Sequence, residues 1–213
     1  MMKKFLLLLV FPLLSGCAEL QQIADSLPQE GGYISNDQIA AGLRQALDKG
    51  IDTQVSKLAQ ENGFFSNELV RITLPPELQK VDKTLRDVGL SSLADEGLKV
   101  LNSAAEDAVQ EATPIFVNAV KEITFTDARD ILLGEDTAAT AYLSSRTSDQ
   151  LYTKFNPVIT NSLEEVGATR VWSNIIQRYN QLPLTSDVNP DLADYVTKEA
   201  LKGVFTMIAV EER

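Results

Sequence analysis

Apolar residues recur every three or four positions along most of the chain, which is the spacing of one face of an α-helix. The clearest case runs from Ser92 to Ile123, where alanine, leucine and phenylalanine keep this spacing and acids and amides lie between them. No segment shows sustained alternation of apolar and polar residues or a run of β-branched side chains, as strands would. The pattern predicts an all-α protein.

Start and stop signals divide the chain into about seven or eight helices. Ser35 with Gln38 and Thr124 with Asp127 are typical caps of helix N-termini. Pro114 should kink the long helix or start a new one. Further helices are expected over residues 75–88, 136–145, 148–166, 168–181 and 190–210, the last of them capped by Asn189. Residues 35–213 are therefore predicted to form a single compact multi-helix bundle.

Two helices of this set share a short pattern. "PIFVNAVKEI" from Pro114 and "PVITNSLEEV" from Pro157 have proline, asparagine, glutamate and an apolar residue at the same offsets. Both helices are expected to bend at their proline. Duplication of a helical hairpin would explain the likeness, and so would amphipathic spacing alone.

The N-terminus carries a different pattern. Lys3 and Lys4 precede an apolar run of ten residues, "FLLLLVFPLL", which is shorter than the roughly 20 residues that a membrane-spanning helix needs. Such a run is typical of a secretory signal peptide. It ends in Leu14-Ser15-Gly16-Cys17, which reads as a bacterial lipobox. We therefore expect residues 1–16 to be a lipoprotein signal peptide and residues 17–34 to be a lipidated cysteine and polar tether.

Cys17 is the only cysteine of the chain, and processing would make it the first residue and the carrier of the lipid. Each buried CH₂ contributes about 0.8 kcal/mol, so several acyl chains such as palmitate would anchor the protein firmly. Ala18 follows the cysteine, which favours export to the outer membrane of a Gram-negative bacterium, with the protein facing the periplasm. The alternative is an ordinary signal peptide with an incidental cysteine.

The remaining composition excludes several functions. The chain has 19 basic and 30 acidic residues, and removal of Lys3 and Lys4 leaves 17 against 30, a net charge of −13. Such a charge disfavours nucleic acid as a partner. The absence of histidine excludes Ser-His-Asp catalysis and histidine zinc sites. We expect no cofactor and no enzyme activity, although carboxylate acid/base work, a Ser–Lys dyad or carboxylate binding of Ca²⁺ or Mg²⁺ stay open.

One stretch resembles a calcium loop. Asp187, Asn189 and Asp191 lie at alternate positions, but Leu192 stands where the loop needs glycine and Lys198 where it needs glutamate. A turn followed by a helix cap is the preferred interpretation, and no metal site is predicted.

The stretch "GEDTAATAY" combines a glycine stop with an acidic helix start. Its simplest interpretation is two abutting helices joined by caps. However, Asp136 and Thr137 compete for one cap position, and Thr140 follows on a face of small hydroxyl side chains. We therefore expect Asp136, Thr137 and Thr140 to form a candidate functional surface.

Several blocks of the sequence resemble one family. They are "ALDKGIDTQVSKL", "NELVRITLPPELQKVDKTLRDVG", "PIFVNAVKEITFTDARDILLGEDTAATAYL" and "DYVTKEALKGVFTMIAVEE", together with the lipobox cysteine. With these the chain is similar, from about Gln38 to Glu212, to the domain of unknown function 4197 family. The resemblance implies a helical Gram-negative lipoprotein without assigned activity, and only the lipid-bearing role of Cys17 carries over.

Three function classes follow. The leading one is a non-catalytic helical lipoprotein that binds or scaffolds a component of the cell envelope. The second is a carrier or sensor of an apolar ligand, and the third is a carboxylate-dependent hydrolase. A large enclosed apolar cavity would favour the carrier, an acid pair facing a cleft would favour the hydrolase, and a flat patch would favour the binding module.

Overall fold

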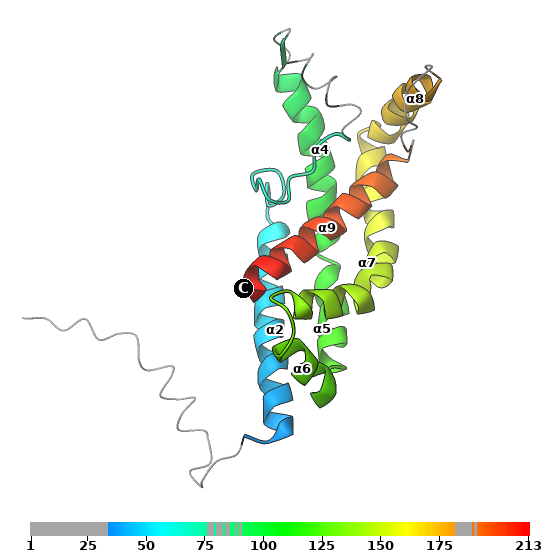
Figure 1. The fold of residues 1–213 in the computed structure, drawn as a ribbon. Helices are drawn as coiled ribbons and strands as arrows, with labels where there is room; N and C mark the ends of the chain where they lie inside the picture. Colours follow the sequence, from blue (N-terminus) through cyan, green and yellow to red (C-terminus); the bar gives the residue numbers. More distant parts are fainter. Residues whose placement is uncertain are drawn as a thin grey trace, which may run out of the picture. The chain divides into compact units, whose positions relative to one another are not determined.

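The computed structural model describes residues 34–75, 79, 83, 86–87, 89, 91–181, 189 and 191–213. Helices make up most of this part of the chain, and no strand occurs in it, which confirms the all-α prediction (Figure 1). The helices are α2 (Asn36–Leu58), α4 (Ser91–Val109), α5 (Ala112–Lys121), α6 (Phe125–Leu132), α7 (Ala138–Glu165), α8 (Ala168–Asn180) and α9 (Leu192–Glu212). None of these helices is long and apolar enough to span a bilayer.

Two predictions fall outside the described residues. The expected signal peptide and all of the tether before Ile34, including Cys17, belong to this part of the sequence. The helix predicted over residues 75–88 also lies mostly outside it.

Residues 36–213 form one compact unit around the helices α7 and α9. The long helix α7 packs against α4, α5, α8 and α9, while α2 packs against α5, α6 and α9. Large side chains fill the centre, and Phe116 meets Phe205 edge to face with ring centroids 5.9 Å apart. Burial of one such side chain contributes about 1.5–3 kcal/mol, so this shared core stabilises the bundle.

Two buried polar side chains of α4, Asn102 and Glu106, form hydrogen bonds with the backbone of the segment that follows α2. Asn102 accepts a hydrogen bond from the backbone N–H of Ile72 and donates one to its carbonyl, both at 2.8 Å. One turn further, the carboxylate of Glu106 accepts hydrogen bonds from the backbone N–H groups of Asn62 and Phe64, each at 3.1 Å. These side chains supply partners that a buried irregular backbone otherwise lacks, so the segment can pack against the core.

Two helix boundaries differ from the prediction. Residues 136–145 and 148–166 are predicted as separate helices, but residues 138–165 form the single helix α7, which also contains Pro157. No residue between them breaks a helix, and the buried Thr147 donates its hydroxyl to the carbonyl of Leu143 within the helix. Pro114 does start a new helix, since it lies in the first turn of α5, where its missing N–H costs little. The two prolines therefore occupy different positions in their helices.

The helix caps show one confirmed prediction and one wrong one. At α6 the Thr124 hydroxyl accepts from the backbone of Asp127, whose carboxylate accepts from the Thr124 backbone in return. At α9 the cap is Asp191, which accepts from the N–H of Asp194 at 3.0 Å, and not Asn189. Asn189 instead donates to the Asp194 carboxylate and accepts from the backbone of Asp191. Asn189 thus bonds to the cap residue and to the first turn of α9 without being the cap itself.

Candidate functional site

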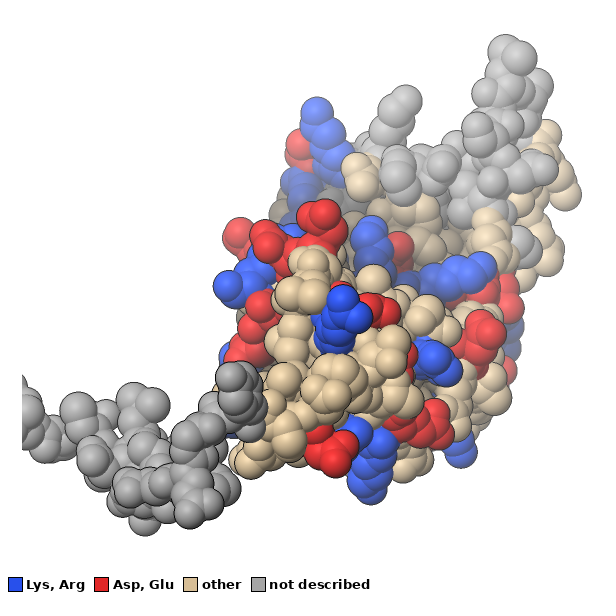
Figure 2. Space-filling model, turned by 60° about the horizontal axis from the view of Figure 1, so that its bottom comes forward, with Lys and Arg blue, Asp and Glu red and all other residues tan. Residues whose placement is uncertain are grey.

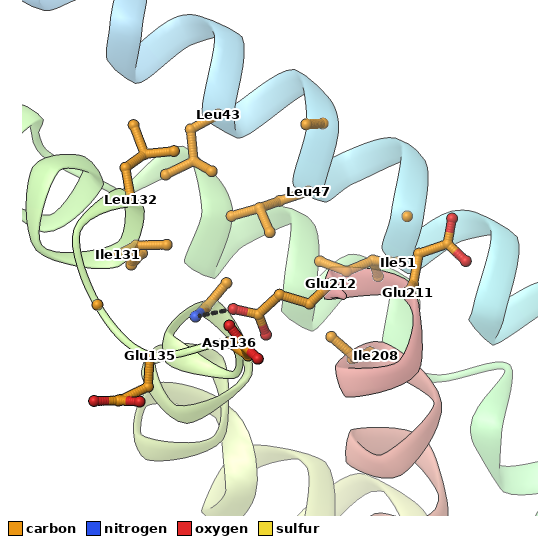
Figure 3. A pocket seen from close by; sticks show the side chains of 14 residues that line it. Leu43, Leu47, Ile51, Ile131, Leu132, Glu135, Asp136, Ile208, Glu211 and Glu212 are labelled. Atoms are coloured by element: carbon orange, nitrogen blue, oxygen red, sulfur yellow. Dashed lines mark hydrogen bonds between the residues drawn. The ribbon is translucent and has the colours of Figure 1, made fainter.

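An open groove of about 370 Å³ lies between α2, the α6–α7 connection and the end of α9 (Figure 3). We call it the α2/α9 groove. Its lining combines apolar residues with carboxylates, and contains no lysine or arginine among the described residues. The lining residues are Leu43, Ala46, Leu47, Gly50, Ile51, Ile131, Leu132, Gly134, Glu135, Asp136, Ala139, Ile208, Glu211 and Glu212.

The apolar wall of the groove comes from α2 and α6. Leu43, Leu47 and Ile51 follow one another at four-residue spacing, so they lie on one face of α2. On α6, Leu132 lines the groove with 55% of its surface exposed, and the neighbouring Leu133 is 75% exposed. Figure 2 brings forward the end of the domain that carries α6, where uncharged residues cover much of the surface between acidic and basic side chains. Apolar side chains that are exposed together commonly mark binding surfaces.

Gly134 shapes the connection between α6 and α7. Its N–H bonds to the carbonyl of Ile131, and the chain then turns directly into α7. A Cβ at this position would lie 2.7 Å from the Cβ of Ala138 and 2.8 Å from the carbonyl oxygen of Asp130. Only glycine permits so close an approach, which keeps α6 and α7 tightly joined at the edge of the groove.

The start of α7 is capped by a residue from α9. Glu212 accepts hydrogen bonds from the backbone N–H groups of Ala139 at 2.7 Å and Thr140 at 3.0 Å, and from the Thr140 hydroxyl at 2.7 Å. Thr137 occupies the N-cap position but forms no side-chain cap bond. The expected competition between Asp136 and Thr137 for the cap is therefore wrong, because the carboxylate of Glu212 already satisfies the free N–H groups.

The neighbouring Glu211 holds α9 to α2. Its carboxylate accepts a hydrogen bond from the amide of Gln54, which is only 2% exposed. Close to this contact lies Gly50, where an added Cβ would be 3.2 Å from the Cγ of Glu211. Two consecutive carboxylates thus fix the last turn of α9 to two other helices and form one wall of the groove.

The structure places the three predicted surface residues differently. Asp136 is exposed and lines the groove, and no hydrogen bond or ion pair among the described residues uses its side chain. Thr137 is half-buried beside it. Thr140 is half-buried and bonded to Glu212, which gives it a structural role. Of the three, Asp136 is the residue that is free to meet a ligand.

Sequence reasoning missed Glu211 and Glu212, although a signal existed. Acidic residues in the last turn of a helix are disfavoured by the helix dipole, and α9 ends with both glutamates and no basic residue in that turn. Hydrogen-bond donors from other helices offset this effect: the N–H groups at the N-terminus of α7 bind Glu212, and the amide of Gln54 on α2 binds Glu211.

Four carboxylates line the groove, and two of them, Glu211 and Glu212, already have structural partners, whereas Glu135 and Asp136 lie exposed. Both oxygens of Glu212 accept hydrogen bonds, and Glu211 is bonded to Gln54. Within the described part of the chain, no three potential metal ligands cluster. What the arrangement offers is an apolar surface beside carboxylates, suited to binding.

Comparison with known proteins adds the family. Searches of curated proteins and of solved structures found no match. The family model described as protein of unknown function (DUF4197) matches residues 33–213, which confirms the resemblance seen in the sequence. The chain therefore belongs to the DUF4197 family of proteins of unknown function.

Proposed function

We propose that the protein is a non-catalytic helical binding module of the bacterial envelope, anchored through lipid on Cys17 and facing the periplasm, that holds a partner in the α2/α9 groove. The observation that carries this proposal is the groove itself. The half-buried Leu43 and Leu47 and the exposed Leu132 line it with apolar surface, and α6 is followed by the exposed Leu133. Water-exposed apolar surface of this kind gains free energy when a partner covers it.

A catalytic role has less support. A hydrolase needs two carboxyl groups that are free to exchange protons with a substrate. Glu211 and Glu212 instead hold helices together, and Glu135 and Asp136 lie exposed at the rim.

A carrier of an apolar ligand is the second candidate, because the volume of about 370 Å³ falls within the range of small-molecule sites. The groove is open, however, whereas a carrier should enclose most of its ligand. The apolar wall therefore fits the surface of a partner better than a sequestered small molecule.

The anchoring part of the proposal comes from the sequence. The basic start, the apolar run and the lipobox agree with lipoprotein processing at Cys17. The acidic chain would not adhere to anionic headgroups by charge, so lipid is the attachment that its composition supports.

Complementation of a deletion strain tests the groove. The variant Leu132→Ser with Asp136→Lys should fail to complement, while its melting temperature and its amount in the membrane fraction stay at wild-type values. The matched control, Leu69→Ser with Glu68→Lys, makes the same kinds of change at exposed residues outside the groove and should complement. Full activity of the groove variant would contradict the proposal.

A further inference from the structure

We infer that the partner of the α2/α9 groove is a basic amphipathic helix, a protein segment with one apolar face flanked by lysine or arginine. This inference rests on the proposed function and adds the chemistry of the partner. Three features lead to it: the length of the groove along α2, the charge of its rim, and the charge of the alternative occupants.

The length of the groove fits a helix. The accessible part of its lining on α2 extends from Leu43 to Gly50, which spans about 10 Å at 1.5 Å per residue, and Ile51 beyond it is buried. Leu132 and Ile131 line it from α6. In Figure 3, Leu43 and Leu132 lie across from each other at one end of this space. An amphipathic helix covers an apolar groove between helices with its residues at positions i, i+3, i+4 and i+7.

The acidic side chains at the rim of the groove favour a partner with positive charge. Glu135 and Asp136 are exposed, and among the described residues neither side chain has a hydrogen-bond or ion-pair partner. A smaller hollow of about 200 Å³ shares Ile131 with the groove and is lined by Asp127 and Asp130, again with no lysine or arginine in its described lining. Asp127 is already bonded to Thr124, so the exposed Asp130, Glu135 and Asp136 are the carboxylates near the groove that complement basic residues at the edges of a partner helix.

Charge also argues against two other occupants. The chain's own residues 18–33 contain Glu19, Asp25 and Glu30 and no basic residue, so the rim would repel them. A second copy would bring a net charge of −13 without the signal peptide and would meet the same repulsion. A separate, basic partner is the occupant that the groove favours.

Binding of designed peptides tests the inference. The probe is a fluorescein-labelled helical peptide with leucines at i, i+3, i+4 and i+7 and lysines beside them. A second peptide carries glutamate in place of every lysine. Fluorescence anisotropy at physiological ionic strength gives the dissociation constant for the whole processed protein in phosphatidylcholine nanodiscs, and empty nanodiscs give the blank.

Variants distinguish the groove from general attraction to an acidic protein. Paired Glu135→Lys and Asp136→Lys should weaken binding of the basic peptide by roughly fivefold or more, as loss and reversal of rim charges imply. Paired Glu164→Lys and Glu165→Lys changes the net charge equally at exposed positions of α7 outside the groove, and should leave the dissociation constant within about twofold. Leu132→Ser should weaken binding and Leu69→Ser should not.

Three results would overturn the inference. They are absence of binding by the basic peptide, equal binding of both peptides, and equal weakening by the two pairs of charge reversals. If both peptides bind and Leu132→Ser weakens them alike, the groove still binds a partner and only the basic chemistry is wrong. Loss of the proposed function itself shows separately, as full complementation by the groove variant.

Discussion

Replacing Glu212 with alanine should release the end of α9 from the start of α7. The substitution removes the acceptor of two backbone N–H groups and of the Thr140 hydroxyl, at 2.7 to 3.0 Å. Loss of a helix cap costs about 0.5–2 kcal/mol, and loss of a further hydrogen bond costs about 0.5–1.5 kcal/mol. Removing an acid from the last turn of α9 returns about 0.5 kcal/mol, because the helix dipole disfavours it there. The expected net loss is about 2 kcal/mol.

Thermal unfolding followed by circular dichroism measures this loss. For a domain of this size, 1 kcal/mol corresponds to roughly 2–4 °C, so Glu212→Ala should lower the melting temperature by about 4–8 °C. Glu212→Gln keeps one carbonyl acceptor without the charge and should fall between wild type and Glu212→Ala. Glu164→Ala removes an exposed carboxylate with no such contact and should shift the melting temperature by less than about 1 °C. Equal melting temperatures for Glu212→Ala and Glu164→Ala would refute the proposed cap.

Three other predictions concern the hydrogen bonds of Asn102 on α4, the N-terminal cap of α6 and the lipid on Cys17. Asn102→Ala leaves the buried N–H and carbonyl of Ile72 unpaired and should lower the free energy of unfolding, measured in urea, by about 3 kcal/mol. A decrease below about 1 kcal/mol would contradict a stabilising role of these two hydrogen bonds. The hydrogen bond from the Thr124 side chain holds the pKa of Asp127 below 3.8, so its stabilisation is present above pH 3.8 and lost as the pH falls through the folded pKa. Asp127→Asn should therefore melt below wild type at about pH 7, and the difference should shrink as the pH is lowered beyond 3.8, whereas a difference that stays constant with pH would count against this linkage. Cys17→Ser should abolish incorporation of a palmitate analogue and leave an unprocessed precursor, and label retained by the variant would exclude the lipid anchor.

The local features of the fold could be predicted from the sequence because their causes lie within a few residues. Apolar residues at every third or fourth position specify the helices. Thr124 and Asp127, three residues apart, specify a cap through contacts with each other. Helix continuity was harder. Residues 136–166 are predicted as two helices, yet Thr147, which lies between them, is buried in the middle of α7.

The contacts that build the groove could not be predicted, because they join distant parts of the chain. Glu212 lies 73 residues from Ala139, and Glu211 lies 157 residues from Gln54. Nothing in the local pattern names these partners. The glutamates at the end of α9 did indicate such a contact, since the helix dipole disfavours acids in the last turn and a hydrogen-bond donor from another helix offsets this. Asp136 is exposed, but the reason for placing it on a functional surface, competition for a cap, was wrong, and its part in such a surface stays a prediction.

Site-specific photo-crosslinking in living cells shows whether a partner occupies the α2/α9 groove. A benzophenone amino acid is placed at Leu132 in the groove or at the similarly exposed Leu69 outside it. We expect one discrete crosslinked product from position 132 that disappears when Asp136→Lys is added, and no such product from position 69. Products of equal yield from both positions, or none from position 132, would contradict the assignment of the α2/α9 groove as the binding site.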